Sequence, residues 1–120
     1  MKILIHSFSA EFRALIRGLL SDMDAEIVTT SSREEMFEEC RAAHYDLLLT
    51  DDARMFMNGQ DAMKRVRCAD ANLPVFILSY DLTEDSVTAL LEQGVSQFIT
   101  LPVAVDRLRK KIESQQRRLV

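Results

Sequence analysis

The chain has 120 residues, of which 48% are hydrophobic and 28% charged, values typical of one globular domain with its own core. Its formal net charge of −4 argues against a chain that binds nucleic acid or an anionic membrane directly. Cys40 and Cys68 lack the spacing of a metal site, so we expect reduced thiols in a cytoplasmic protein. The apolar run at the start is too short for a signal peptide or a membrane span.

Short apolar runs alternate with helical patterns along the chain. Strands are predicted at residues 3–5, 27–30, 47–50, 74–79 and 97–100. A helix is predicted after each strand, with apolar residues every three or four positions over residues 12–20 and a last helix over about 103–118. Ser32 and Glu35 form a capping box before the second helix, and Gly94 ends the fourth. The sequence therefore predicts a single α/β domain over residues 1–120, a doubly wound five-stranded parallel sheet with five helices.

Ligands of such sheets bind beyond the carboxyl ends of the strands. The residues at these positions are His6 to Ser9, Asp51 and Asp52, Ser79 and Tyr80, and Leu101 and Pro102. We expect the function of the domain to depend on them.

Four segments resemble the receiver domain of bacterial two-component response regulators, in the same order and spacing. Residues 46–51 (DLLLTD) resemble the third strand, which ends in the aspartate that accepts a phosphoryl group, here Asp51. Gly59 matches the glycine of the following loop, residues 74–79 (PVFILS) match the strand that ends in a hydroxyl, Ser79, and residues 94–102 match the segment that ends in Pro102. The resemblance implies the strand order 2-1-3-4-5, and a coupling pair made of Ser79 and Phe98.

Three positions depart from that family's pattern. Ser7 and Phe8 stand where the family has two acidic residues that help to hold Mg²⁺, and Leu101 replaces the lysine before the proline. Mg²⁺ is usually held by carboxylates and waters, and phosphoryl transfer needs positive charge near the phosphoryl oxygens. We therefore expect weak or absent Mg²⁺ binding, no other cofactor, and a pseudo-receiver in which Asp51 is inactive or slow.

Two neighbours of Asp51 carry open alternatives. His6 ends the first strand and could donate to Asp51 in place of the missing cation, or it could be a neutral histidine packed in the strand. Asp52 could raise the proton affinity of the acidic pair, although we expect it to point into water. The large apolar residues Met55, Phe56 and Met57 cover the depleted site, form a contact patch or fold back on the core.

The charge of the chain is unevenly distributed. Residues 1–105 carry nine basic and seventeen acidic residues, whereas residues 106–120 carry six basic and two acidic ones. We expect a protein partner on the surface of the fourth helix, fifth strand and fifth helix, including the basic residues Arg107, Arg109, Lys110 and Lys111. A homodimer is a further expectation.

The sequence leaves two other functions open. One is a phosphoacceptor that uses Asp51 with an atypical metal shell. The other is a small flavodoxin-like protein that binds a nucleotide or a flavin, although the loop after the first strand (HSFSA) has no glycine to approach a phosphate closely. No arrangement of serine, histidine and aspartate predicts a hydrolase, and we expect no enzymatic activity.

Overall fold

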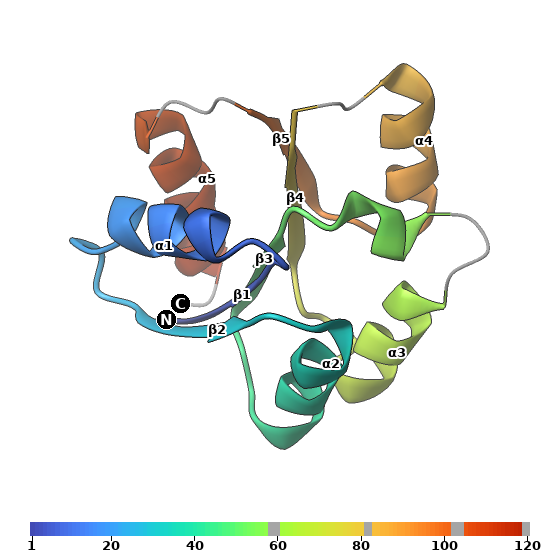
Figure 1. Cartoon of the computed structure of the whole chain (residues 1–120), viewed down its shortest axis with the longest axis horizontal. Helices are drawn as coiled ribbons and strands as arrows, with labels where there is room; N and C mark the ends of the chain where they lie inside the picture. Colours follow the sequence, from blue (N-terminus) through green and yellow to red (C-terminus); the bar gives the residue numbers. More distant parts are fainter. Residues whose placement is uncertain (58–60, 81–82, 102–104, 119–120) are drawn as a thin grey trace.

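The computed structural model describes residues 1–57, 61–80, 83–101 and 105–118. Five parallel strands form one sheet in the order β2-β1-β3-β4-β5, as predicted (Figure 1). In chain order the elements are β1 (Lys2–His6), α1 (Ala10–Leu19), β2 (Glu26–Thr30), α2 (Arg33–Ala42), β3 (Leu47–Thr50), the 3₁₀ helix η1 (Ala53–Phe56), α3 (Ala62–Ala69), β4 (Val75–Ser79), α4 (Glu84–Glu92), β5 (Gln97–Thr100) and α5 (Val105–Arg118).

The helices cover both faces of the sheet and create two apolar cores (Figure 1). On one face α1 and α5 contribute Ile16, Leu20, Leu108 and Ile112. On the other face α2, α3 and α4 contribute residues that include Met36, Phe37, Met63, Val66 and Leu90. Successive residues of β3 point to opposite cores and all are buried, which is why this strand is an uninterrupted apolar run.

Side-chain caps fix where three helices begin. The hydroxyls of Ser9, Ser32 and Thr83 each accept a hydrogen bond from the backbone N–H three residues later. Such a cap typically stabilises a helix by about 1 kcal/mol. After α4 the chain turns at Gly94, whose φ of 95° lies in the left-handed region that favours glycine.

The segment after β3 is helical and packs against the core. Residues Ala53–Phe56 form η1, and the side chains of Met55 and Phe56 are each 1% exposed. The alternative of an exposed patch is therefore wrong for these two residues, because they fold back on the core. Gly59 and Pro102 lie outside the described residues, as do residues 103 and 104 at the expected start of the last helix. No helix in the described ranges is long and apolar enough to cross a membrane.

Candidate functional site

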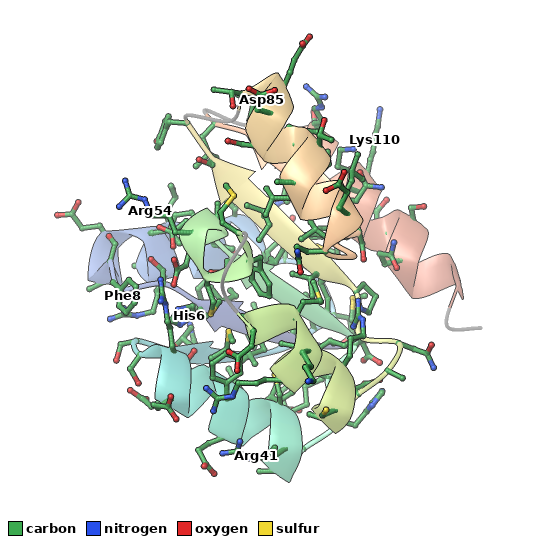
Figure 2. The ribbon with its side chains drawn as sticks, turned by 90° about the vertical axis from the view of Figure 1, so that its right-hand side faces the viewer. His6, Phe8, Arg41, Arg54, Asp85 and Lys110 are labelled. Carbon is green, nitrogen blue, oxygen red and sulfur yellow. The ribbon has the colours of Figure 1, made fainter. Side chains whose placement is uncertain are left out.

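A hollow of about 430 Å³ lies at the carboxyl ends of β1, β3 and β4. Ser7, Asp51 and Ser79 follow or end these strands and line it together. The other lining residues are Phe8, Ser9, Asp52, Ala53, Arg54, Met57 and Ser86. Phe8 and Arg54 lie on the same side of the molecule, with His6 beside Phe8 (Figure 2). The topology thus brings part of the predicted strand-end set into one cleft. His6, Tyr80 and Leu101 are not among its lining residues, and Pro102 lies outside the described residues.

Ser7 connects Asp51 to the start of α1. Its hydroxyl donates its proton to Asp51 Oδ2 at 3.0 Å and accepts a hydrogen bond from the backbone N–H of Ser9 at 2.9 Å. The backbone of Ser7 is held as well, because its N–H donates to Thr30 and its carbonyl accepts from Arg13. Ser7 is therefore a fully buried, fixed partner of Asp51.

The carboxyl group of Asp51 is partly buried, and burial raises its pKa because water no longer solvates the charge fully. The hydrogen bond from Ser7 opposes this shift but does not cancel it. Asp51 thus binds a proton more readily than an ordinary aspartate.

Asp52 has a different environment from its neighbour. Arg33 donates from Nε to Asp52 Oδ2 at 2.8 Å and from Nη2 to Asp52 Oδ1 at 3.0 Å. Burial disfavours the charged form of Asp52, but His6 and Arg33 outweigh it and lower the pKa to about 2. The Asp52 side chain is only 7% exposed, so the expectation that it points into water is wrong. It is wrong because sequence alone does not show that the start of α2 reaches the end of β3.

His6 is completely buried at the end of β1. Its Nδ1 lies 3.3 Å from Thr30 Oγ1, and its Nε2 lies 3.6 Å from Asp52 Oδ2. The carboxylate beside His6 is therefore Asp52, which corrects the hypothesis of a hydrogen bond to Asp51. The alternative of a histidine packed within the strand agrees with its complete burial.

Apolar side chains occupy the two remaining positions at which the sequence departs from the family pattern. Phe8 is 61% exposed, its ring meets His6 edge-on at 5.3 Å, and the guanidinium of Arg33 lies 5.8 Å from its centroid. Leu101 packs partly buried against the core shared by α1 and α5, while its N–H donates to the Ser79 carbonyl. Phe98 packs partly buried against the opposite core.

The residues of the cleft do not fit a magnesium ion. Mg²⁺ prefers an octahedral shell of oxygens, usually from carboxylates and waters. Here Asp52 is bound by Arg33, the Ser7 proton is directed at Asp51, and Phe8 has no oxygen in its side chain. Within the described ranges, no three His, Cys, Asp or Glu side chains come together as a metal site would require.

Sequence reasoning missed Arg33 as a member of this site. The residue lies in the segment SSREE, whose serine and glutamates predicted a helix start and nothing else. A usable signal was its position three residues after the end of β2, because β2 neighbours β1 and ends at the same edge of the sheet.

The sequence is similar to a known protein family and to several known proteins. Residues 3–113 match the family described as the response regulator receiver domain. The chain is 27% identical to the chemotaxis protein CheY of Pseudomonas aeruginosa, over 94% of each protein. It is 25% identical to the sensory/regulatory protein RpfC of Xanthomonas campestris pv. campestris over 90% of this chain but only 15% of that protein.

Solved structures with similar folds cover nearly the whole chain. A two-component response regulator from Clostridium difficile has a TM-score of 0.85 at 20% identity, covering 99% of this chain and 98% of that one. A response regulator from Desulfuromonas acetoxidans has a TM-score of 0.84 at 23% identity, with the same coverage. These two similarities support the fold alone.

Proposed function

The chain belongs to the response regulator receiver domain family of two-component signalling, and we propose that it acts by binding protein partners, without Mg²⁺-dependent phosphorylation of Asp51. The observation that carries the proposal is the set of contacts around Asp51. A neutral serine hydroxyl faces its carboxylate, and the positions of the second acid and the lysine hold Phe8 and Leu101. The domain is then a signalling module rather than an enzyme, and we place it in the cytoplasm.

Energetics favour this proposal over a working phosphoacceptor. Phosphoryl transfer depends on neutralising the charge spread over the phosphoryl oxygens. The loss of one preorganised contact of this kind typically costs about 3–4 kcal/mol, or about 10²–10³ in rate. With both the metal ligands and the lysine replaced, reaction at Asp51 is expected to be too slow for signalling.

A second candidate function rests on the shape of the cleft. Asp51 and Ser79 line the same hollow, so a carboxylate and a hydroxyl both border the space where a phosphoryl group would sit. A phosphoacceptor with an atypical metal shell would use this pair.

We place the partner surface on α4, β5 and α5. Arg107 and Lys110 are exposed on α5, and Leu91 is 55% exposed on α4. Arg109 binds Asp22 and the Leu19 carbonyl, and Lys111 donates to Gln97, so these two cations have partners within the domain.

A homodimer through this surface would lose affinity in the variant Lys110→Glu, which analytical ultracentrifugation would detect. An unchanged monomer–dimer distribution in that variant contradicts the homodimer.

The two candidate functions are separated by a phosphorylation assay. The protein is incubated with acetyl phosphate and Mg²⁺ and weighed by mass spectrometry, with Asp51→Asn as the control. We expect no phosphoryl group on either protein, and an unchanged amide NMR spectrum when beryllofluoride and Mg²⁺ are added. Labelling that requires Asp51 would overturn the proposal and establish the phosphoacceptor.

A further inference from the structure

We propose that Arg33 is the positioning residue of the cleft: it is a resident counter-charge that fixes Asp52 and leaves Asp51 as the carboxylate that can change its charge. The proposal concerns the ionisation of two adjacent carboxylates. It is independent of whether Asp51 is phosphorylated, because it is tested without a phosphodonor or a metal.

The contact between Arg33 and Asp52 has the geometry of a strong pair. Two parallel N–H donors meet the two carboxylate oxygens at 2.8 and 3.0 Å, which fixes the carboxylate in orientation as well as in charge. Asp52 is shielded from water, while the Arg33 side chain is 38% exposed. The hydrogen bond from Asp52 N–H to Thr50 Oγ1 at 3.0 Å holds the backbone in place.

The position of Arg33 in its own helix favours a tertiary role. It is the first residue of α2, and a positive charge at a helix N-terminus is unfavourable with respect to the helix dipole. Glu34 and Glu35, which follow it, have the favourable sign for this end. The cation is therefore better explained by Asp52, 19 positions further along the chain, than by the stability of α2.

His6 stands behind this pair as a second group facing Asp52. Thr30 Oγ1 pairs with His6 Nδ1 at 3.3 Å, and His6 Nε2 lies toward Asp52 Oδ2. The distance of 3.6 Å is too long for a hydrogen bond, and Nε2 has no hydrogen-bond partner among the described residues. Arg33 thus makes the hydrogen bonds that fix the orientation of Asp52, while His6, at 3.6 Å, adds to the lowering of its pKa.

The pKa of Asp51 depends mainly on its own burial and little on the charge of Asp52. Repulsion by the adjacent Asp52 carboxylate is thus a minor influence. The guanidinium of Arg33 lies over the ring of Phe8, so Arg33 also contacts the residue at the rim of the cleft.

The test is a pH titration of the aspartate side-chain carboxyl carbons by NMR, in the absence of metal and phosphodonor. In the unchanged protein the Asp52 signal should stay constant from pH 7 down to about pH 3.5, because its pKa lies well below the value of about 3.9 of an ordinary aspartate. In Arg33→Gln the Asp52 signal should move within that window, and Arg33→Lys should give an intermediate curve by restoring charge without the paired donors. The matched control is Arg54→Gln, because Arg54 is an exposed arginine on the same cleft. This variant should leave the titration of Asp52 unchanged.

Two results would overturn the proposal. One is an Asp52 titration in Arg33→Gln that coincides with that of the unchanged protein, which would mean that His6 alone holds the carboxylate. The other is an equal shift in Arg54→Gln, which would mean that any nearby cation suffices. Because Arg33→Lys keeps the positive charge, it provides a folded variant should Arg33→Gln unfold.

Discussion

Arg33, the first residue of α2, binds both carboxylate oxygens of Asp52, two residues beyond the end of β3. This contact gives two neighbouring acids opposite properties. The pKa of Asp52 falls to about 2, whereas burial raises the pKa of Asp51. The cleft therefore contains a shielded carboxylate that stays charged down to about pH 2, beside one that takes up a proton more easily.

The first prediction concerns the stability of the pair. Asp52→Asn removes a charge partner of a half-exposed arginine, so we expect a loss of about 1–2 kcal/mol at pH 7, between the values of exposed and buried ion pairs. Because the folded pKa is depressed, this stabilisation is fully present above the unfolded value of 3.8 and disappears as the pH falls through about 2. Urea unfolding at several pH values measures the difference. A difference that grows in acid would contradict the assignment.

The second prediction is that removing the Asp51 carboxylate stabilises the fold, whereas removing that of Asp52 destabilises it. Asp51→Asn removes a carboxylate whose ionisation burial disfavours, so it should stabilise the fold at neutral pH, by at most about 1 kcal/mol given its partial exposure. The gain should appear as the pH rises through the ordinary aspartate range and vanish in acid, where the carboxyl is already neutral in both states. Thermal unfolding at pH 3 to 7 tests this, and destabilisation at pH 7 would show that the Ser7 hydrogen bond outweighs burial.

The third prediction is a gain of function. The triple variant Ser7→Asp, Phe8→Asp and Leu101→Lys reintroduces two acids and a lysine at the positions where the chain departs from its family. Labelling by acetyl phosphate with Mg²⁺ should rise by about 10²-fold or more, the typical value of one such contact. The same variant with Asp51→Asn is the control. If the triple variant stays unlabelled, other features of the cleft prevent the reaction.

The fourth prediction distinguishes the two thiols. Cys68 is exposed, whereas Cys40 is buried, and burial raises the pKa of the Cys40 thiol to about 11. Since the thiolate is the reactive form, a thiol reagent at pH 8 should modify Cys68 alone in the folded protein. Mass spectrometry should find Cys68→Ser unmodified until denaturant is added. Rapid modification of native Cys68→Ser would mean that α2 opens readily.

Most of the fold could be predicted because its signals are local. Residues 47–50 form an apolar run typical of a strand that is covered on both faces, Ser32 and Glu35 indicate a helix start, and Gly94 indicates a helix end. The 3₁₀ helix after Asp51 was not predicted, because three apolar residues in a row fit a buried turn as well as an exposed patch.

The site could be predicted only in part, for a physical reason. Ser7, Asp51 and Ser79 were found because the ends of parallel strands meet at one edge of the sheet. The partner of His6 was not, because Asp51 and Asp52 are adjacent in sequence and only the turn after β3 decides which carboxylate faces β1. Arg33 was missed because its contact depends on how α2 packs, and the only signal for it was its position after β2, which ends at the same edge of the sheet as β1.

The buried pair Met55 and Phe56 limits how the cleft can respond to a change of charge. Uncovering a large apolar side chain costs about 1.5–3 kcal/mol, so lifting η1 from the core would cost several kcal/mol for the pair. A single proton gained or lost at Asp51 is too small an event to drive that movement. The 3₁₀ helix that follows Asp51 thus keeps its shape in both protonation states of the carboxylate, so only the charge of the cleft changes and its contour does not.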